Sequence, residues 1–207
     1  MEVVPAATRA AGLDAATAEW VLFTDEDDIP DDALLDTLVA AQVATGADVV
    51  TAGVRPSDDA EAVQLFLGDP GSLGLIENQY GVLGLVRRSL AARALAAGPT
   101  DSDWVLMARL AAAGAHFVSI PDALSEQVGR PASVARSPAE GLAVLEAFEQ
   151  GDQKVLAGLP LLTATLAAAV AALEAARQSD GVAPAPVPRA LRKLSRQLRS
   201  IRKPTLG

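Results

Sequence analysis

Cysteine is absent from this sequence of 207 residues, and aromatic residues make up only 3% of it. The absence of cysteine excludes a disulfide framework and a thiolate metal site, and it fits a reducing compartment. Hydrophobic residues make up 50% of the chain, so it can bury a sizeable core, which must consist mainly of alanine, leucine and valine. The length predicts one domain of moderate size with an appendage.

Acidic residues are missing from the end of the chain, although they dominate the rest of it. Residues 1–180 hold all 26 acidic residues and 10 of the 17 basic ones, which gives a net charge of −16. Residues 181–207 hold the other 7 basic residues and no acid. The first part should repel nucleic acid, so we expect no nucleic-acid partner, and only the tail could attract an anionic surface.

The sequence also lacks the pattern of a signal peptide, because Met1–Pro5 offers neither a basic segment nor a long apolar run. Residues 155–173 carry no charge and approach the length of a membrane span. They are mostly Ala, Gly and Thr, however, and Pro160 interrupts them. We therefore favour a helix over 161–177 that packs on the domain or pairs with another chain, with membrane contact as the alternative.

The most distinctive stretch of the chain is a run of four acids after a short apolar segment. Residues 20–24 have strand character, and Asp25, Glu26, Asp27 and Asp28 follow directly. Carboxylates this close repel one another unless a positive charge lies among them. Mg²⁺ or Mn²⁺ with oxygen ligands is the usual partner for such a cluster. The alternative is a solvated acidic loop that caps the next helix.

Hydrophobic periodicity and turn residues predict alternating helices and strands. Helices are expected at residues 6–17, 31–45, 88–97, 102–113 and 138–150, with a short one at 60–67. Strands are expected at residues 20–24, 48–54, 80–86, 116–120 and 123–128. The strand–helix–strand order over the first part predicts parallel strands in an α/β layer.

Turn and cap residues mark several of the expected helix ends. Gly46 is expected to cap the C-terminus of the helix over 31–45. Either Asp101 or Thr100 can cap the N-terminus of the helix over 102–113. Pro138 can open the helix over 138–150, with Ser137 as its N-cap.

Two stretches, residues 8–16 and 19–28, resemble the centre of the bacterial family-two glycosyltransferases with the GT-A fold. In that family a helix of the form "aRNaGl-aA" leads into "geyvlflDaDD". The resemblance continues through residues 47–53, 84–90, 102–109, 114–118 and Pro121. It implies a partial GT-A fold, which is Rossmann-like with a mixed, mostly parallel sheet, followed by C-terminal helices. The β–α units that precede this region in the family, with half of the nucleotide site, have no counterpart here.

This resemblance and the composition together divide the chain into four parts. A truncated domain of GT-A type is expected over 1–135 and a helical extension over 136–178. A Pro/Ala linker follows over 179–188, and residues 189–207 form a basic amphipathic tail. Such a tail is typical of binding to a membrane surface, and a disordered, soluble tail is the alternative.

By the same resemblance, Asp25 and Asp27 form the D-x-D motif that holds Mn²⁺ or Mg²⁺ against the diphosphate of a nucleotide sugar. Asp27 is the expected direct ligand, and Asp25 contacts the ribose or a metal-bound water. Asp28 is equally suited to be a helix cap. Arg9 matches the basic residue that reaches the nucleotide in the family, although Ala10 replaces the Asn that usually follows it.

Asp103 matches the second acid of the family's "ED" pair, which implies that it is the catalytic base for the acceptor hydroxyl. Ser102 replaces the first acid, and Asp101 is a candidate to compensate. The alternative is that Asp101 and Asp103 only complement a helix N-terminus. For Trp104 we favour core packing over stacking on a sugar.

The resemblance thus implies inverting transfer of a sugar from a nucleotide-sugar donor to a cell-envelope glycan or lipid-linked acceptor, with impaired activity in this chain alone. We expect the protein in the cytoplasm, either free or peripheral at the inner face of the membrane. Three explanations for the missing half of the site stay open: the gene product starts upstream, another chain supplies the half, or the chain is a degenerate descendant without catalysis. A protein partner or a homo-oligomer is expected as well. The alternatives are a non-catalytic partner or remnant that serves as a binding or assembly module, and a structural α/β domain with solvated acids.

Overall fold

The structure is a computed structural model that describes residues 3–25, 28–57, 63–127, 138–151 and 154–157. The chain divides into two compact units, Met1–Leu156 and Ala157–Gly207. Nearly all of the described residues belong to the first unit, which is the subject of this section. The expected helix over 161–177, the linker over 179–188 and the tail over 189–207 lie outside the described residues.

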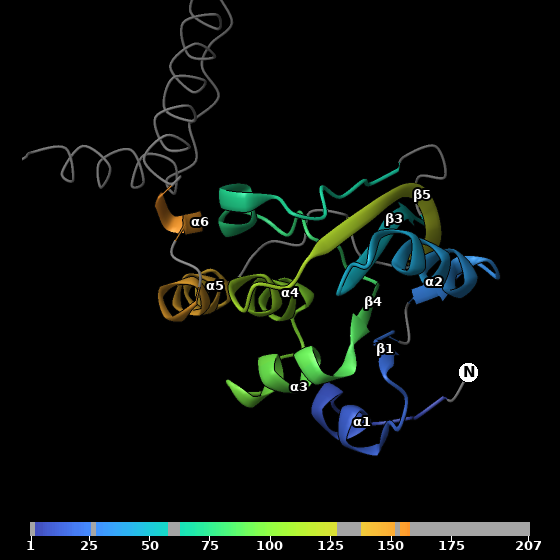
Figure 1. The fold of residues 1–207 in the computed structure, drawn as a ribbon, viewed down its shortest axis with the longest axis horizontal. Coiled ribbons are helices and arrows are strands. Elements are labelled where there is room, and N and C mark those ends of the chain that lie inside the picture. Colours follow the sequence, from blue (N-terminus) through green and yellow to red (C-terminus); the bar gives the residue numbers. More distant parts are fainter. Residues whose placement is uncertain (1–2, 26–27, 58–62, 128–137, 152–153, 158–207) are drawn as a thin grey trace, which may run out of the picture. The chain divides into compact units, whose positions relative to one another are not determined.

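A five-stranded sheet forms the centre of the first unit, with the order β1-β4-β3-β5-β2 (Figure 1). The strands are β1 (Trp20–Leu22), β2 (Asp28–Pro30), β3 (Val49–Pro56), β4 (Gly84–Arg87) and β5 (Phe117–Gln127). Only β3 and β5 pair in parallel, and the other three neighbouring pairs are antiparallel. The α/β class and the mixed sheet are confirmed, but among the described strands the mostly parallel arrangement is wrong.

The sheet is not mostly parallel because β4 lies between β1 and β3 and runs opposite to both. β1 and β3 therefore point the same way, as the strand–helix–strand pattern predicts, without being neighbours. The crossover between them contains α2 (Leu34–Thr45), which ends at Gly46 in the left-handed conformation, with φ 67°. Glycine adopts this conformation without a steric penalty, and the predicted C-cap is confirmed.

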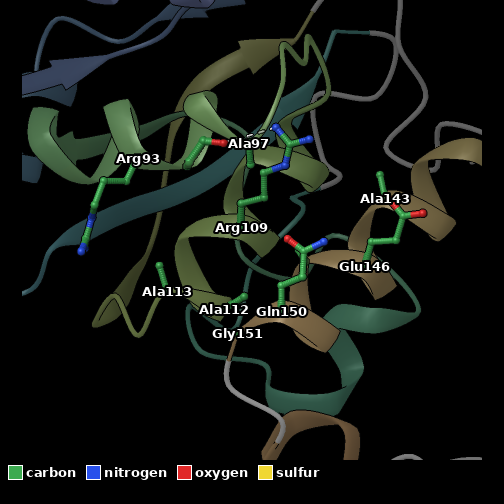
Figure 2. Close-up of a pocket in the computed structure, with 11 residues that line it drawn as sticks. Arg93, Ala97, Arg109, Ala112, Ala113, Ala143, Glu146, Gln150 and Gly151 are labelled. Atoms are coloured by element: carbon green, nitrogen blue, oxygen red, sulfur yellow. Dashed lines mark hydrogen bonds between the residues drawn. The ribbon is translucent and has the colours of Figure 1, made fainter.

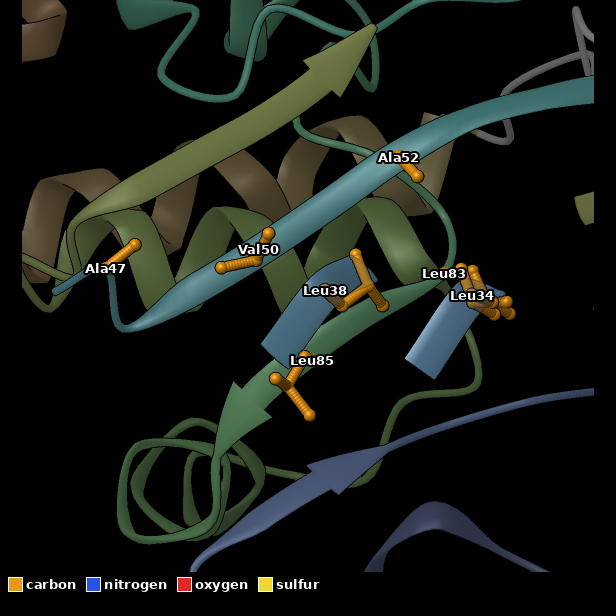
Figure 3. Close-up of a cluster of buried hydrophobic side chains, with 7 residues drawn as sticks. All are labelled: Leu34, Leu38, Ala47, Val50, Ala52, Leu83 and Leu85. Carbon is orange, nitrogen blue, oxygen red and sulfur yellow. The ribbon is translucent and has the colours of Figure 1, made fainter. Parts of the chain in front are cut away.

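α2 packs on one face of the sheet through a cluster of aliphatic side chains (Figure 3). Leu34 and Leu38 are the buried residues of α2, and they meet Val50 of β3 and Leu85 of β4. The whole buried cluster consists of Leu34, Leu38, Ala47, Val50, Ala52, Leu83 and Leu85. Burial of an aliphatic side chain of this size contributes about 1.5–3 kcal/mol, so this cluster fixes the helix to the sheet.

The other described α-helices are α1 (Arg9–Ala15), α3 (Arg88–Ala96), α4 (Asp103–Ala112), α5 (Pro138–Gln150) and the short α6 (Lys154–Ala157). A 3₁₀ helix, η1, spans Gly71–Leu75. α4 is the most buried of the helices and packs between α3 and α5. Among the described residues, no helix combines the length and the apolar character needed to cross a membrane.

Several local predictions differ from the structure. The helix expected over 60–67 is wrong in its described part, because residues 63–67 form no helix and Gln64 bridges Val54 of β3. The strands expected over 116–120 and 123–128 form one strand, β5, and its pairing with β3 shifts register between Ala52 and Val54. This irregularity accommodates Pro121, which has no N–H to donate. β2 is a strand that periodicity did not predict.

Candidate functional site

The site begins with Arg9, which opens α1. Thr8 caps this helix, because its Oγ1 accepts a hydrogen bond from the N–H of Ala11 over 3.2 Å. The Arg9 side chain is only 9% exposed, and its Nη2 donates a hydrogen bond of 2.6 Å to Oδ1 of Asp103. The same nitrogen lies 3.8 Å from Oδ2 of Asp25. The structure thus brings together three of the predicted site residues.

Asp103 is the first residue of α4, where the helix N-terminus favours a negative charge. The N-cap is Ser102, whose Oγ accepts a hydrogen bond of 3.4 Å from the N–H of Val105, so the expectation of Asp101 or Thr100 is wrong. Thr100 instead accepts a hydrogen bond from the N–H of Ser102. The sequence pattern placed the helix correctly and missed the cap by one residue.

Burial is the main cause that raises the pKa of the Asp103 carboxyl to about 6. The charge of Arg9 and its hydrogen bond act in the opposite direction and lower this pKa, whereas the charges of Asp25 and Asp28 raise it further. The carboxyl therefore lies in a site where acids outnumber the cation. A pKa of this size leaves the group mostly ionised at pH 7 and able to accept a proton.

Asp25 and Asp28 flank the turn that follows β1. Oδ2 of Asp28 accepts a hydrogen bond of 2.9 Å from the N–H of Asp25, which closes the turn. Asp28, the first residue of β2, thus bonds back to Asp25 and does not cap α2, whose N-cap is Ala33. Asp25 keeps 39% of its side chain exposed. Glu26 and Asp27, the second of which is the expected direct metal ligand, lie outside the described residues.

A divalent cation fits the chemistry of this turn. Within the described residues there is no group of three or more potential metal ligands, but Mg²⁺ bound beside a diphosphate needs only one or two carboxylates. Asp25 supplies a partly exposed carboxylate, and the acids around Asp103 create a negative field there. These hard oxygen donors suit Mg²⁺ or Mn²⁺ rather than a soft metal.

Arg9 carries a second feature that the sequence did not reveal. Its Nη1 is buried and has no hydrogen-bond partner among the described residues. The guanidinium also lies over the ring of Phe23, 5.8 Å from the ring centre. A buried donor without a partner costs about 1–3 kcal/mol, so a ligand that offers an acceptor here would recover that free energy.

Two other residues near α4 have structural roles. Trp104 is buried, and its Nε1 donates a hydrogen bond of 2.7 Å to the carbonyl of Gly74, as the core-packing interpretation expects. Arg109 donates from Nη1 to the carbonyl oxygens of Gly98 and Ala94, over 2.6 and 3.3 Å. It therefore ties α4 to the end of α3.

A pocket of about 260 Å³ lies between α3, α4 and α5 (Figure 2). Its lining includes the last turns of α4, with Arg109 and Ala112, and Glu146 and Gln150 of α5. Asp103 lies at the other end of α4, a helix of 10 residues, which spans about 15 Å. The pocket is thus separate from the Arg9–Asp103 pair.

Comparisons with known proteins agree with this fold. Residues 4–66 match the family model "Glycosyl transferase family 2". Among solved structures, S. aureus TarS in complex with UDP-GlcNAc shares this fold, with a TM-score of 0.53 and 17% identity. The match covers 79% of this chain and 52% of the solved TarS chain, which is TarS 1–349, so this chain spans about half of that structure. No curated protein matches the sequence. Residues 4–66 therefore match the model of the family-two glycosyltransferases, and the chain has a GT-A-like fold.

Proposed function

We propose that this chain forms the acceptor side of an enzyme that transfers a sugar, with inversion, from a nucleotide-sugar donor to a hydroxyl group. The observation that carries the proposal is the convergence of Arg9, Asp25 and Asp103, although Arg9 and Asp103 are 94 residues apart in the sequence. A family match in residues 4–66 supports glycosyl transfer as the general reaction.

Asp103 is the proposed catalytic base. Its carboxylate accepts the proton of the acceptor hydroxyl while that oxygen forms a bond to the anomeric carbon. The bond between the anomeric carbon and the diphosphate oxygen breaks on the opposite side, and the electron pair leaves with the nucleoside diphosphate. A base with a pKa of about 6 is ionised at neutral pH and still basic enough to take part in the transfer.

Asp25 and Asp27 are the proposed residues for Mn²⁺ or Mg²⁺ and the donor. When bound, the cation would neutralise charge on the leaving diphosphate. Arg9 is the proposed donor contact, because its unpartnered Nη1 can donate to an oxygen of the nucleotide. Its positive charge suits the same anionic group.

The donor class rests on family likeness, since TarS was solved with UDP-GlcNAc. A cell-envelope glycan or a lipid-linked glycan is the proposed acceptor, with action in the cytoplasm or at the inner face of the membrane. The basic residues of 181–207 are the proposed membrane contact. We propose that activity is weak until another chain or segment completes the nucleotide site.

A thermal-shift titration of the chain with Mn²⁺ and UDP, GDP or dTDP tests the donor site. We expect stabilisation that needs metal and nucleotide together and that disappears in Asp27→Ala. Asp32→Ala is the matched control, because Asp32 is an exposed acid beyond β2, and it should respond like the wild type. An unchanged melting temperature with every diphosphate would contradict donor binding by this chain.

A binding module without catalysis is the second candidate function. β1 pairs with β4 on one side, and no other described strand pairs with its opposite edge. An open edge can accept a strand from a partner. Co-purification followed by mass spectrometry tests this role: a partner with a nucleotide-binding half would support it, whereas a chain that purifies alone and transfers sugar would exclude it.

A further inference from the structure

One nitrogen of Arg9 lies between the two carboxylates that the proposed reaction uses. Nη2 is 2.6 Å from Oδ1 of Asp103 on the acceptor side and 3.8 Å from Oδ2 of Asp25 on the donor side. The Arg9 side chain is 9% exposed and that of Asp103 17% exposed, so water screens this pair weakly. The shorter contact has the geometry of a charge-assisted hydrogen bond.

We propose that Arg9 is a positioning residue for Asp103: it fixes Oδ1, keeps the carboxylate ionised, and leaves Oδ2 to take the proton of the acceptor. The role of Asp103 as the base rests on the function proposed above. The hydrogen bond between Arg9 and Asp103 does not rest on that function, and it can be tested without catalytic turnover.

The charges that surround Asp103 explain why it needs a positively charged side chain beside it. Arg9 approaches from α1, whereas Asp25 and Asp28 approach from the turn after β1 and from β2. Burial and both neighbouring acids disfavour the ionised form of Asp103, and Arg9 is the group that favours it. An opposite charge at this distance lowers a carboxyl pKa by about 1–3 units. Without Arg9, at least about half of Asp103 would be protonated at neutral pH, and the protonated fraction could not act as a base.

The surroundings of Arg9 fix its position before any ligand binds. Thr8 caps the first turn of α1 through the N–H of Ala11, and the guanidinium lies over Phe23. A planar guanidinium can contact an aromatic face and a carboxylate at once, which the ammonium group of lysine does less well. We therefore expect lysine at position 9 to restore the charge and only part of the effect.

Carbon-13 NMR of the full chain with labelled aspartate carboxyl groups measures the effect directly. Asp103→Asn assigns the Asp103 signal. In Arg9→Met we expect the titration midpoint of Asp103 to rise by at least about one pH unit, and in Arg9→Lys by less than half as much. Arg87→Met is the matched control, because it breaks ion pairs with Glu19 and Asp48 and should leave Asp103 unchanged.

An Asp103 midpoint that stays the same in folded Arg9→Met would overturn the proposal. Asp25→Asn keeps it testable if Arg9→Met does not fold. This variant removes a partly exposed acid that raises the pKa of Asp103. The positive charge of Arg9 would then act on Asp103 without Asp25 as a competitor, and the titration midpoint of Asp103 should fall. A midpoint that does not fall in Asp25→Asn would show that the charges of Arg9 and Asp25 do not set the charge state of Asp103, and it would overturn the proposal.

Kinetics then separate positioning from donor binding. With a donor and an acceptor, Arg9→Met should lower kcat at pH 7 by at least about twofold, in line with the smaller ionised fraction of Asp103, and the acid limb of its pH profile should move to higher pH. A raised donor KM with unchanged kcat and an unchanged Asp103 midpoint would make Arg9 a donor-binding residue only. If the wild type transfers no sugar, the proposed function fails, while the NMR titration still decides the role of Arg9.

Discussion

Asp103 shows how two local effects compete at a single residue. Its place at the start of α4 favours a negative charge, and the hydrogen bond from Arg9 has the same effect. Burial acts against both and is the larger influence, because the pKa of the carboxyl rises to about 6. A solvated helix-capping acid would not show such a rise, so the environment supports a functional role over simple helix capping.

The pH dependence of transfer follows from this pKa. A base must be ionised to accept a proton, so kcat should be low at pH 5, rise through about pH 6, and level off near pH 7. Initial rates at saturating donor and acceptor measure this profile. Asp103→Asn should lower kcat by at least about 100-fold, and a profile that stays flat from pH 5 to pH 8 would rule out Asp103 as the base.

Trp104 gives a prediction about stability that also concerns a single residue. Trp104→Phe keeps an aromatic ring in the core but removes the donor to Gly74, so the carbonyl of Gly74 loses its partner. We expect the free energy of unfolding to fall by about 1–3 kcal/mol, as measured by urea denaturation. Trp20→Phe is the comparison, since Trp20 is only half-buried, and an equal loss in both variants would mean that the hydrogen bond contributes little.

At the scale of elements, a network around Asp48 ties β3, β4 and β5 together. Oδ1 of Asp48 accepts a hydrogen bond from Nε of Arg87, and Oδ2 accepts one from the N–H of His116. Arg87 also pairs with Glu19, whose side chain is 70% exposed. An exposed ion pair contributes little to stability, whereas a carboxylate with two partners on different strands contributes more.

This difference predicts unequal losses in two variants. Asp48→Ala should lower the free energy of unfolding by about 1–3 kcal/mol, because two donors lose their acceptor. Glu19→Gln should lower it by less than about 1 kcal/mol. Chemical denaturation of both variants at the same ionic strength checks the order, and a greater loss in Glu19→Gln would refute it.

Gly81 enables the close approach of its loop to β3. Its φ is 135°, and a Cβ at this position would lie 2.6 Å from the Cβ of Thr51. Gly81→Ala should therefore destabilise the fold by about 1–3 kcal/mol through strain and overpacking. Gly141→Ala is the matched control, because nothing lies within 4 Å of its added Cβ in α5, and helix propensity should stabilise it slightly. Thermal unfolding of both variants gives the comparison.

The elements that the sequence predicted well are those with a clear periodic or capping signal. The helix over 138–150 has the predicted bounds in α5, and Gly46 ends α2 as expected. β2 was missed because it has three residues, of which Asp28 and Pro30 are poor strand formers. Its pairing with β5 comes from tertiary contacts, which a local pattern does not contain.

At the scale of the whole molecule, the site was predictable only in part. The family resemblance identified Arg9, Asp25 and Asp103 one by one and assigned Arg9 to nucleotide binding. The contact between Arg9 and Asp103 joins positions 94 residues apart, and neither composition nor periodicity encodes such a pair. The sheet order also depends on long-range pairing, so the position of β4 between β1 and β3 was not visible from the order of elements along the chain.

The sequence separation of Arg9 and Asp103 also has a kinetic consequence. Closing so large a loop costs conformational entropy before the new contact repays it, and such contacts tend to form late in folding. Local pieces such as α3 with α4 can form earlier, because they are neighbours in the chain. The Arg9–Asp103 ion pair is therefore expected among the last contacts to form, so a partly folded chain would contain most of its helices and still lack this pair.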